Sequence, residues 1–122
     1  MATTEQDISE QFYVVARESG QERRDLPTWA ARQSGNIRFE VPSNLKPTRS
    51  DIDAVPGSFH VLNLLSVDEC DQFTASTDLL GYHLDAPVSL PHSVRHNTNL
   101  NWIVDESVDG PIWDRCKDLI PE

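Results

Sequence analysis

The spacing of apolar residues is most regular in the second half of the chain, where it predicts a strand followed by a helix. The run SFHVLNLL at residues 58–65 alternates apolar and polar side chains, as a half-buried strand does. Ser66 precedes Glu69 by three residues, which is the capping-box pattern of a helix start, and Gly81 suits a left-handed C-terminal cap. The inner stripe of the helix is expected to contain Val67, Cys70, Phe73, Thr77 and Leu80.

Three further elements are predicted after this helix. YHLDAPVSLPHS at residues 82–93 reads as an extended run at a sheet edge, because two prolines interrupt it. NWIVD at residues 101–105 predicts a short strand. The tripeptide DGP at 109–111 is expected to open a second helix, since proline is tolerated in the first turn, and Pro121 is expected to end it. The inner face of this helix would hold Ile112, Trp113, Cys116, Leu119 and Ile120.

The first half of the chain is less regular. Asp7–Ser19 has the spacing of a short helix, although QFYVVAR within it fits a strand equally well. Leu26–Gln33 predicts a brief helix, with Pro27 in its first turn. Residues 34–57 hold three prolines and no sustained period, which is typical of a linker or a loosely docked segment.

These elements predict an α+β fold in two parts. Residues 1–55 form an N-terminal arm that is partly helical or flexible, and residues 56–122 place two helices on a small, mostly antiparallel sheet. A chain of 122 residues supports at most one ordinary domain. If one sheet face stays uncovered by other chain segments, its apolar side chains should promote self-association.

Charge limits the partners that the chain can have. The formal net charge is −10, of which residues 61–122 carry −8. Such a surface repels nucleic-acid phosphates and anionic lipid, so neither nucleic acid nor a membrane is an expected partner. The sequence shows no leader and no apolar run long enough to span a bilayer, which favours the cytoplasm. In that compartment Cys70 and Cys116 are expected to be reduced, packed thiols.

His83 and Asp85 are the only candidate metal ligands with a recognisable spacing. Residues two apart on a strand point to the same side, so a His-x-Asp pair can grip one metal ion. A third ligand would have to come from His92 or His96, which follow too closely after two prolines. The pair is therefore expected to be an ordinary strand residue and a turn acid. A nucleophilic pairing of Cys70 with His60 is disfavoured, because the thiol falls on the predicted inner stripe.

The polar loop at residues 93–101 is a candidate binding segment. Arg95 offers a planar fork for a carboxylate or carbonyl, and Asn97, Asn99 and Asn101 offer paired donors and acceptors. The alternative is a purely structural role, in which the asparagines form turns and Arg95 pairs with nearby acidic side chains. Composition alone favours the structural alternative.

A succession of short motifs runs through residues 56–122, and together they resemble a known family. The motif residues are Leu65, Ser66, Glu69 and Cys70; Gly81 and Tyr82; Ala86, Pro87 and Val88; Arg95 and Asn97; and Ile112, Trp113, Arg115 and Pro121. In order and spacing they resemble the opening section of iron(II)/2-oxoglutarate-dependent oxygenases of the prolyl 4-hydroxylase-like group. The resemblance covers a little over half of the chain.

The resemblance implies the N-terminal section of a double-stranded β-helix, or jelly-roll, dioxygenase. The complete protein would use iron(II), dioxygen and 2-oxoglutarate to hydroxylate a substrate such as a peptidyl side chain. In the family the metal triad and the basic residue that anchors 2-oxoglutarate lie downstream of the matched section. No iron role is therefore carried onto His83 or Asp85, no cofactor is expected on this chain alone, and the chain is expected to be inactive by itself. Arg95 and Asn97 resemble a loop on the substrate side.

Two kinds of partner follow from two hypotheses. An oxygenase section would contact the remainder of its own domain. The alternative is a non-catalytic acidic module that binds another protein, with Trp29, Trp102 and Trp113 as contact residues.

Overall fold

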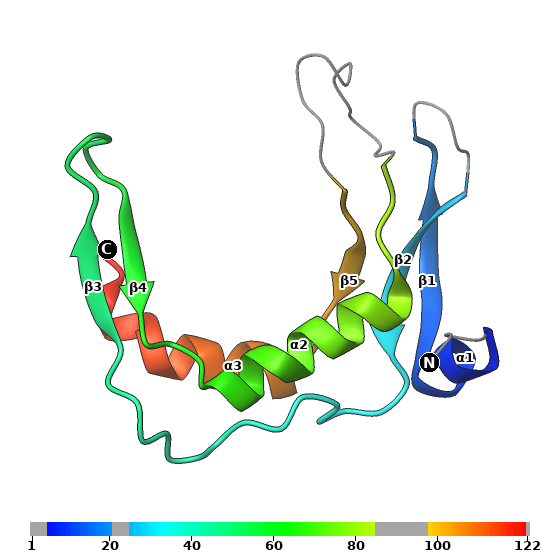
Figure 1. The fold of residues 1–122 in the computed structure, drawn as a ribbon, viewed down its shortest axis with the longest axis horizontal. Helices are drawn as coiled ribbons and strands as arrows, with labels where there is room; N and C mark the ends of the chain where they lie inside the picture. The colour runs from blue at the N-terminus through cyan, green and yellow to red at the C-terminus, as the bar shows by residue number, and fades with distance from the viewer. Residues whose placement is uncertain (1–4, 21–24, 85–97, 122) are drawn as a thin grey trace. The chain divides into compact units, whose positions relative to one another are not determined.

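The computed structural model describes residues 5–20, 25–84 and 98–121 and shows an α+β protein with two small sheets in this part of the chain (Figure 1). Three α-helices and a short 3-10 helix accompany the sheets in the described part. The predicted α+β class with mostly antiparallel pairing is confirmed. The chain forms two compact units, unit 1 from residues 1–36 and 74–104 and unit 2 from residues 37–73 and 105–122.

Unit 1 begins with helix α1 (Glu5–Gln11), which passes directly into strand β1 (Phe12–Glu18). The segment QFYVVAR, for which helix and strand were both open, is thus almost entirely strand. Strand β2 (Leu26–Ala31) pairs antiparallel with β1, with Phe12 opposite Ala31. The predicted helix at Leu26–Gln33 is therefore wrong. Helix propensity is a weak preference, and the hydrogen bonds to β1 override it.

Strand β5 (Asn101–Ile103) completes the sheet of unit 1 in the order β1-β2-β5 and lies parallel to β2. This confirms the short strand predicted near residue 102. One face of the sheet carries Phe12, which is 2% exposed and meets the Trp102 ring edge-to-face at 5.7 Å between centroids. Leu26 and Leu80 are further buried apolar residues of unit 1.

Unit 2 contains a hairpin of strands β3 (Thr48–Asp51) and β4 (Phe59–Leu62). Strand β4 confirms the prediction from residues 58–65. Strand β3 lies in the segment that was expected to have no regular structure. Its residues are all exposed, so no apolar pattern marks it; backbone pairing and the Arg49 guanidinium, 4.2 Å from the Phe59 ring centroid, hold it in place.

Helix α2 (Val67–Leu80) begins and ends where the sequence predicts. The Glu69 backbone N–H donates to Ser66 Oγ at 3.1 Å, and the Ser66 N–H donates to Glu69 Oε1 at 2.8 Å, which completes the capping box. Gly81 has a φ of +83° and donates its N–H to the Thr77 carbonyl. The predicted inner stripe is partly wrong, because Val67 is 80% exposed and Cys70 is also exposed.

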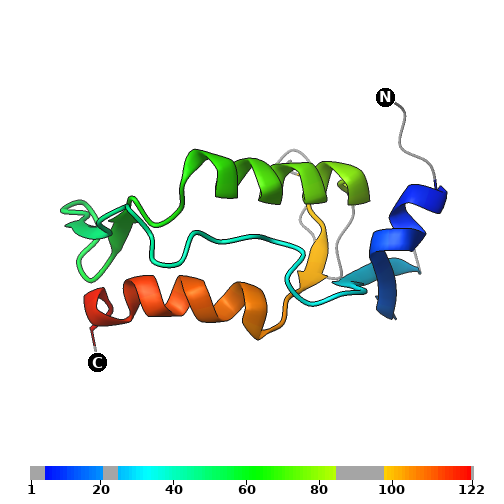
Figure 2. The ribbon, with the colours of Figure 1, turned by 90° about the horizontal axis from the view of Figure 1, so that it is seen from below.

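Helix α3 (Glu106–Cys116) continues into the 3-10 helix η1 (Lys117–Leu119). Its predicted start at residues 109–111 is wrong, because Asp105 is the N-cap and the proline lies inside the helix. Trp113, predicted to be buried, is 51% exposed. Figure 1 and Figure 2 together show residues 37–47 running along one side of α3 and of the part of α2 that belongs to unit 2, and Glu40 contacts a residue of each helix. None of the described helices is both long and apolar enough to cross a membrane.

Candidate functional site

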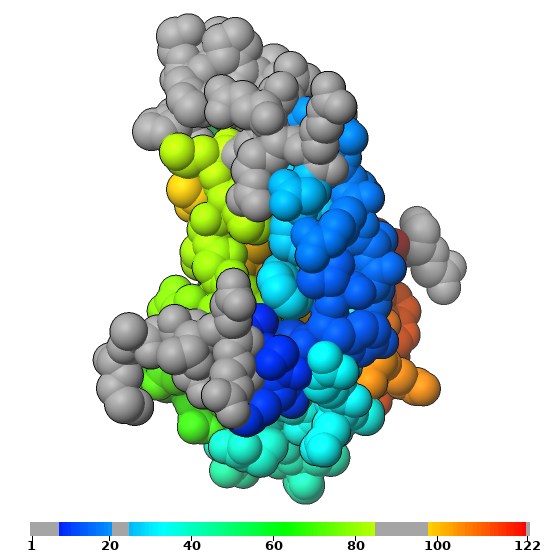
Figure 3. Space-filling view, turned by 90° about the vertical axis from the view of Figure 1, so that its right-hand side faces the viewer, coloured from blue at the N-terminus to red at the C-terminus, as the bar shows by residue number. Residues whose placement is uncertain are grey.

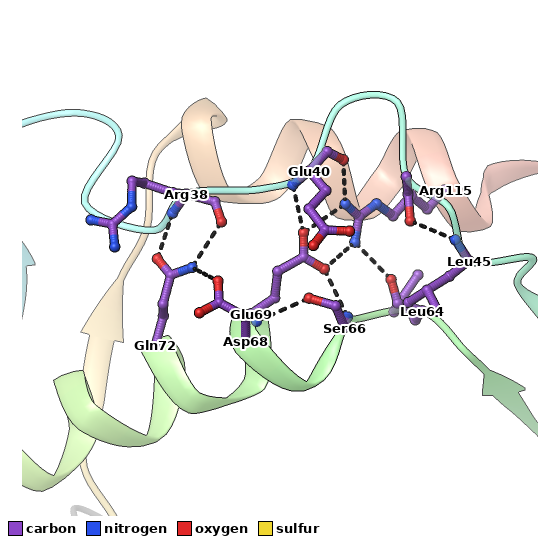
Figure 4. Close-up of polar contacts among 10 residues, drawn as sticks. Arg38, Glu40, Leu45, Leu64, Ser66, Asp68, Glu69, Gln72 and Arg115 are labelled. Carbon is purple, nitrogen blue, oxygen red and sulfur yellow. Dashed lines mark hydrogen bonds and ion pairs between the residues drawn. The ribbon is translucent and has the colours of Figure 1, made fainter.

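Glu69 and Arg115 form a bidentate ion pair inside unit 2 (Figure 4). Arg115 Nη1 donates to Glu69 Oε1 at 2.7 Å, and Nη2 donates to Oε2 at 2.8 Å. The Glu69 side chain is fully buried and that of Arg115 is 9% exposed. The pair joins the first turn of α2 to the last turn of α3.

The same two side chains also hold the loops around them. Arg115 donates to the Leu64 and Glu40 carbonyls at 2.8 Å each, and the Glu40 N–H donates to Glu69 Oε2 at 2.8 Å (Figure 4). Each of these three hydrogen bonds involves the Arg115 guanidinium or the Glu69 carboxylate, and bonds to charged groups are short and strong. We call Glu40, Leu64, Ser66, Glu69 and Arg115 the ion-pair cluster. It connects three separate stretches of unit 2, around residue 40, residues 64–69 and the end of α3.

The electrostatics of the ion-pair cluster favour the charged state of both partners. Hydrogen bonding from Arg115 lowers the pKa of Glu69 to about 2; burial opposes this shift, and the N–H groups of Ser66 and Glu40 reinforce it. The hydrogen bond to Glu69 in turn raises the pKa of Arg115 above its ordinary value. A general acid or base needs a pKa near the working pH. The pair is therefore suited to hold structure at neutral pH and unsuited to move protons.

A second contact fixes the irregular segment of unit 2 to α2. Gln72 Nε2 donates to the Arg38 carbonyl at 2.9 Å, and the Arg38 N–H donates to Gln72 Oε1 at 2.7 Å. The Gln72 side-chain amide thus pairs with the backbone N–H and carbonyl of Arg38, as a neighbouring strand would. Phe39 adds a ring contact to Phe73 at 6.2 Å between centroids. The part of the predicted linker that precedes β3 is thus held by its neighbours, although it forms no helix or strand.

The candidate metal ligands are only partly placed. His83 forms an isolated antiparallel bridge with Asn99, with backbone N···O distances of 2.7 and 2.8 Å in the two directions. Asp85 lies outside the described residues. Within residues 5–20, 25–84 and 98–121, no group of three or more His, Cys, Asp or Glu side chains is arranged to hold a metal ion.

The polar loop is also described only at its end. Arg95 and Asn97, the predicted substrate-side residues, lie outside the described part of the chain. Asn99 pairs with His83, and its Nδ2 donates to the His83 carbonyl at 3.2 Å; Asn101 begins β5. For these two asparagines the structural alternative fits what is seen.

The two cysteines differ in their surroundings. Both are free thiols, and Cys116 is buried as predicted. Cys70 is exposed, because α2 turns Glu69 rather than its neighbour toward the interior of unit 2. The predicted burial of Cys70 is therefore wrong.

Unit 1 contains a cavity of about 230 Å³ that the sequence did not reveal. It lies between the end of α1, the residues after β2 and the later part of α2. Its lining includes Glu10, Phe12, Arg32, Ser34, Asn36 and Ser76. The cavity could not be predicted with a helix at Leu26–Gln33. It forms because residues 26–31 are a strand paired with β1, which places Arg32 next to the end of α1. No local signal in the sequence marks this return.

Neither a family model, nor a curated protein, nor a solved structure matches this chain.

Proposed function

We propose that this chain is the N-terminal support section of an iron(II)/2-oxoglutarate-dependent dioxygenase of the prolyl 4-hydroxylase-like group. The observation that carries the proposal is the ion pair between Glu69 and Arg115. Both residues belong to the motifs that resemble the family, and 46 positions separate them in the sequence. Because the two side chains bind each other, the motif that contains Glu69 and the motif that contains Arg115 are both needed for the same contact.

Other motif residues also have structural roles. Ser66 caps α2, and Gly81 ends it with a left-handed backbone. Tyr82 donates its hydroxyl hydrogen to Thr77 Oγ1 at 2.7 Å, which ties the residues after α2 back to the helix. These contacts are what a section that supports a catalytic domain would need.

In the proposed complete protein, the sheet of unit 1 would continue into a jelly roll that holds iron(II) and 2-oxoglutarate. Those groups would activate dioxygen and hydroxylate a substrate such as a peptidyl side chain. In the proposal the metal ligands lie downstream of this chain, so no chemical step is assigned to its residues. Arg95 and Asn97 are proposed to border the substrate.

The transcript that encodes the chain offers the most direct test. We expect the reading frame to continue beyond the codon for Glu122 into a segment with a His-x-Asp pair, a later histidine and a basic residue. A stop codon at that point, or a continuation without this pattern, would contradict the proposal.

A turnover assay tests the inactivity of the isolated chain. With iron(II), 2-oxoglutarate and ascorbate added, succinate should not exceed the level of a protein-free control. Succinate formation that disappears in His83→Ala would overturn this expectation and identify His83 as a metal ligand.

Trp113 favours a second candidate function, a non-catalytic acidic module that binds another protein. Its side chain is 51% exposed on α3, beside Asp109 and Asp114, which are also exposed. Large aromatic side chains are frequent anchors of protein interfaces. Trp29 and Trp102, by contrast, stand opposite each other in the sheet of unit 1. A natural stop codon after Glu122 would favour the module over the oxygenase section.

A further inference from the structure

We infer that the cavity of unit 1 is a binding site for a small zwitterion, a free α-amino acid. The inference is independent of the proposed oxygenase function. It rests on the size of the cavity, on the two opposite charges in its lining and on the contacts that hold Arg32. Figure 3 shows the end of α1 and the residues after β2 side by side on this face of unit 1.

Arg32 is the cationic group of the cavity, and three contacts fix it. Its backbone N–H donates to the Gln11 carbonyl at 2.9 Å, and its Nε donates to the Ser9 carbonyl. Its guanidinium also lies 5.6 Å from the Tyr13 ring centroid. Neither Nη group donates a hydrogen bond to another described residue, so both can bind a ligand. A guanidinium that is already held in place loses little entropy when it binds a carboxylate.

Glu10 is the anionic group of the cavity, one residue before the end of α1. Among the described residues Glu10 and Arg32 form no ion pair with each other, so both charges face the same space without cancelling directly. The C-terminal end of a helix also favours a positive charge nearby. A ligand with both an ammonium and a carboxylate group can pair its ammonium with Glu10 and its carboxylate with Arg32.

The remaining lining fits such a ligand. Ser34, Asn36 and Ser76 supply hydroxyl and amide groups, and Phe12 supplies an apolar floor that is packed on Trp102. The cavity is smaller than the roughly 300–1,000 Å³ of pockets for drug-sized molecules. The net charge of −10 works against a simple anion, whereas a zwitterion carries no net charge to repel.

The test is a titration of the ¹⁵N-labelled chain with L-leucine, followed by NMR, with acetate and methylamine as single-charge probes. We expect saturable shifts of the amides of Phe12, Ser34 and Ser76 with L-leucine, and at least fivefold weaker binding of each single-charge probe. Equal binding of acetate and L-leucine would overturn the zwitterion, and absence of any saturable shift would overturn the site.

Two pairs of variants separate the site from a general surface effect. Ser76→Leu fills the cavity and should abolish the shifts, whereas Ala75→Leu, at the exposed neighbouring position of α2, should leave them unchanged. Glu10→Gln should weaken binding about threefold, while Glu18→Gln, which removes the same charge from exposed β1, should not. Binding of L-leucine that survives Ser76→Leu would contradict the inference.

Discussion

Arg115 and Glu69 stabilise unit 2 only as a pair, because each alone would be a charge removed from water. Arg115→Ala should lower the free energy of unfolding by about 3 kcal/mol, since it leaves a buried carboxylate without its main partner. Chemical denaturation followed by circular dichroism measures the change. Lys117→Ala is the matched control, because its ion pair with Asp114 is exposed and should contribute less than about 1 kcal/mol. Equal effects of the two variants would show that the buried pair has no special role.

The same pair makes stability depend on pH in a defined window. Glu69 has a pKa of about 2 in the folded protein and 4.5 as its ordinary value, so folding favours its ionised form. This contribution is complete above pH 4.5 and is lost as the pH falls toward 2; the shift corresponds to about 3 kcal/mol. Melting temperatures between pH 6 and pH 2 should therefore fall steeply in the native chain and less steeply in Glu69→Gln. Glu106→Gln, at an exposed position of α3, should keep the native slope.

At the residue scale, the sequence predicts what neighbours along the chain decide and misses what distant segments decide. The capping role of Glu69 could be predicted, because its partner Ser66 is three residues away. Its burial could not, because that depends on Arg115. The cavity was missed for the same reason, since Glu10 and Arg32 come together only through strand pairing.

At the scale of the element, helix α3 begins at a side-chain cap, and the spacing of its apolar residues does not mark this start. Asp105 Oδ1 accepts hydrogen bonds from the Ser107 N–H, at 2.9 Å, and from the Ser107 hydroxyl. Asp105→Ala should lower the free energy of unfolding by about 1 kcal/mol and speed amide hydrogen exchange in the first turn of α3. Asp109→Ala removes an exposed acid from the same helix without removing the cap, so its effect should be smaller. A larger loss in Asp109→Ala would assign the stabilisation to the helix dipole instead.

Elements with their own start and stop signals were predicted well. Helix α2 has both, and strand β4 has a recognisable alternation of apolar and polar residues. Strand β2 has no such pattern, because Leu26, Pro27 and Thr28 are all buried although neighbouring side chains of a strand point to opposite faces. For α3, the start was predicted at residues 109–111 because proline favours the first turn of a helix. The helix starts earlier because Asp105 is its N-cap.

At the scale of the whole molecule, the two units are each built from two separate stretches of chain. Helix α2 contributes residues to both, with the change between Phe73 and Thr74. A pattern read along the sequence describes continuous segments, such as the predicted division at residue 55. Units that are discontinuous in sequence depend on contacts between distant residues, which a single sequence does not display.

An apolar row on the sheet of unit 1 leads to the expectation that the chain self-associates. Tyr13, Ala30 and Ile103 stand opposite one another across the three strands, and Tyr13 and Ile103 are 42% and 57% exposed. An exposed apolar surface on a sheet is a contact site for another chain or for a further part of the same protein. Sedimentation velocity should therefore show concentration-dependent dimers, and Ile103→Lys should return the chain to monomer because a charge cannot be buried there without a partner. Val55→Lys, at a position that is 58% exposed in unit 2, should leave the dimer intact. A native chain that stays monomeric at high concentration would show that the row is not a contact site for a second copy.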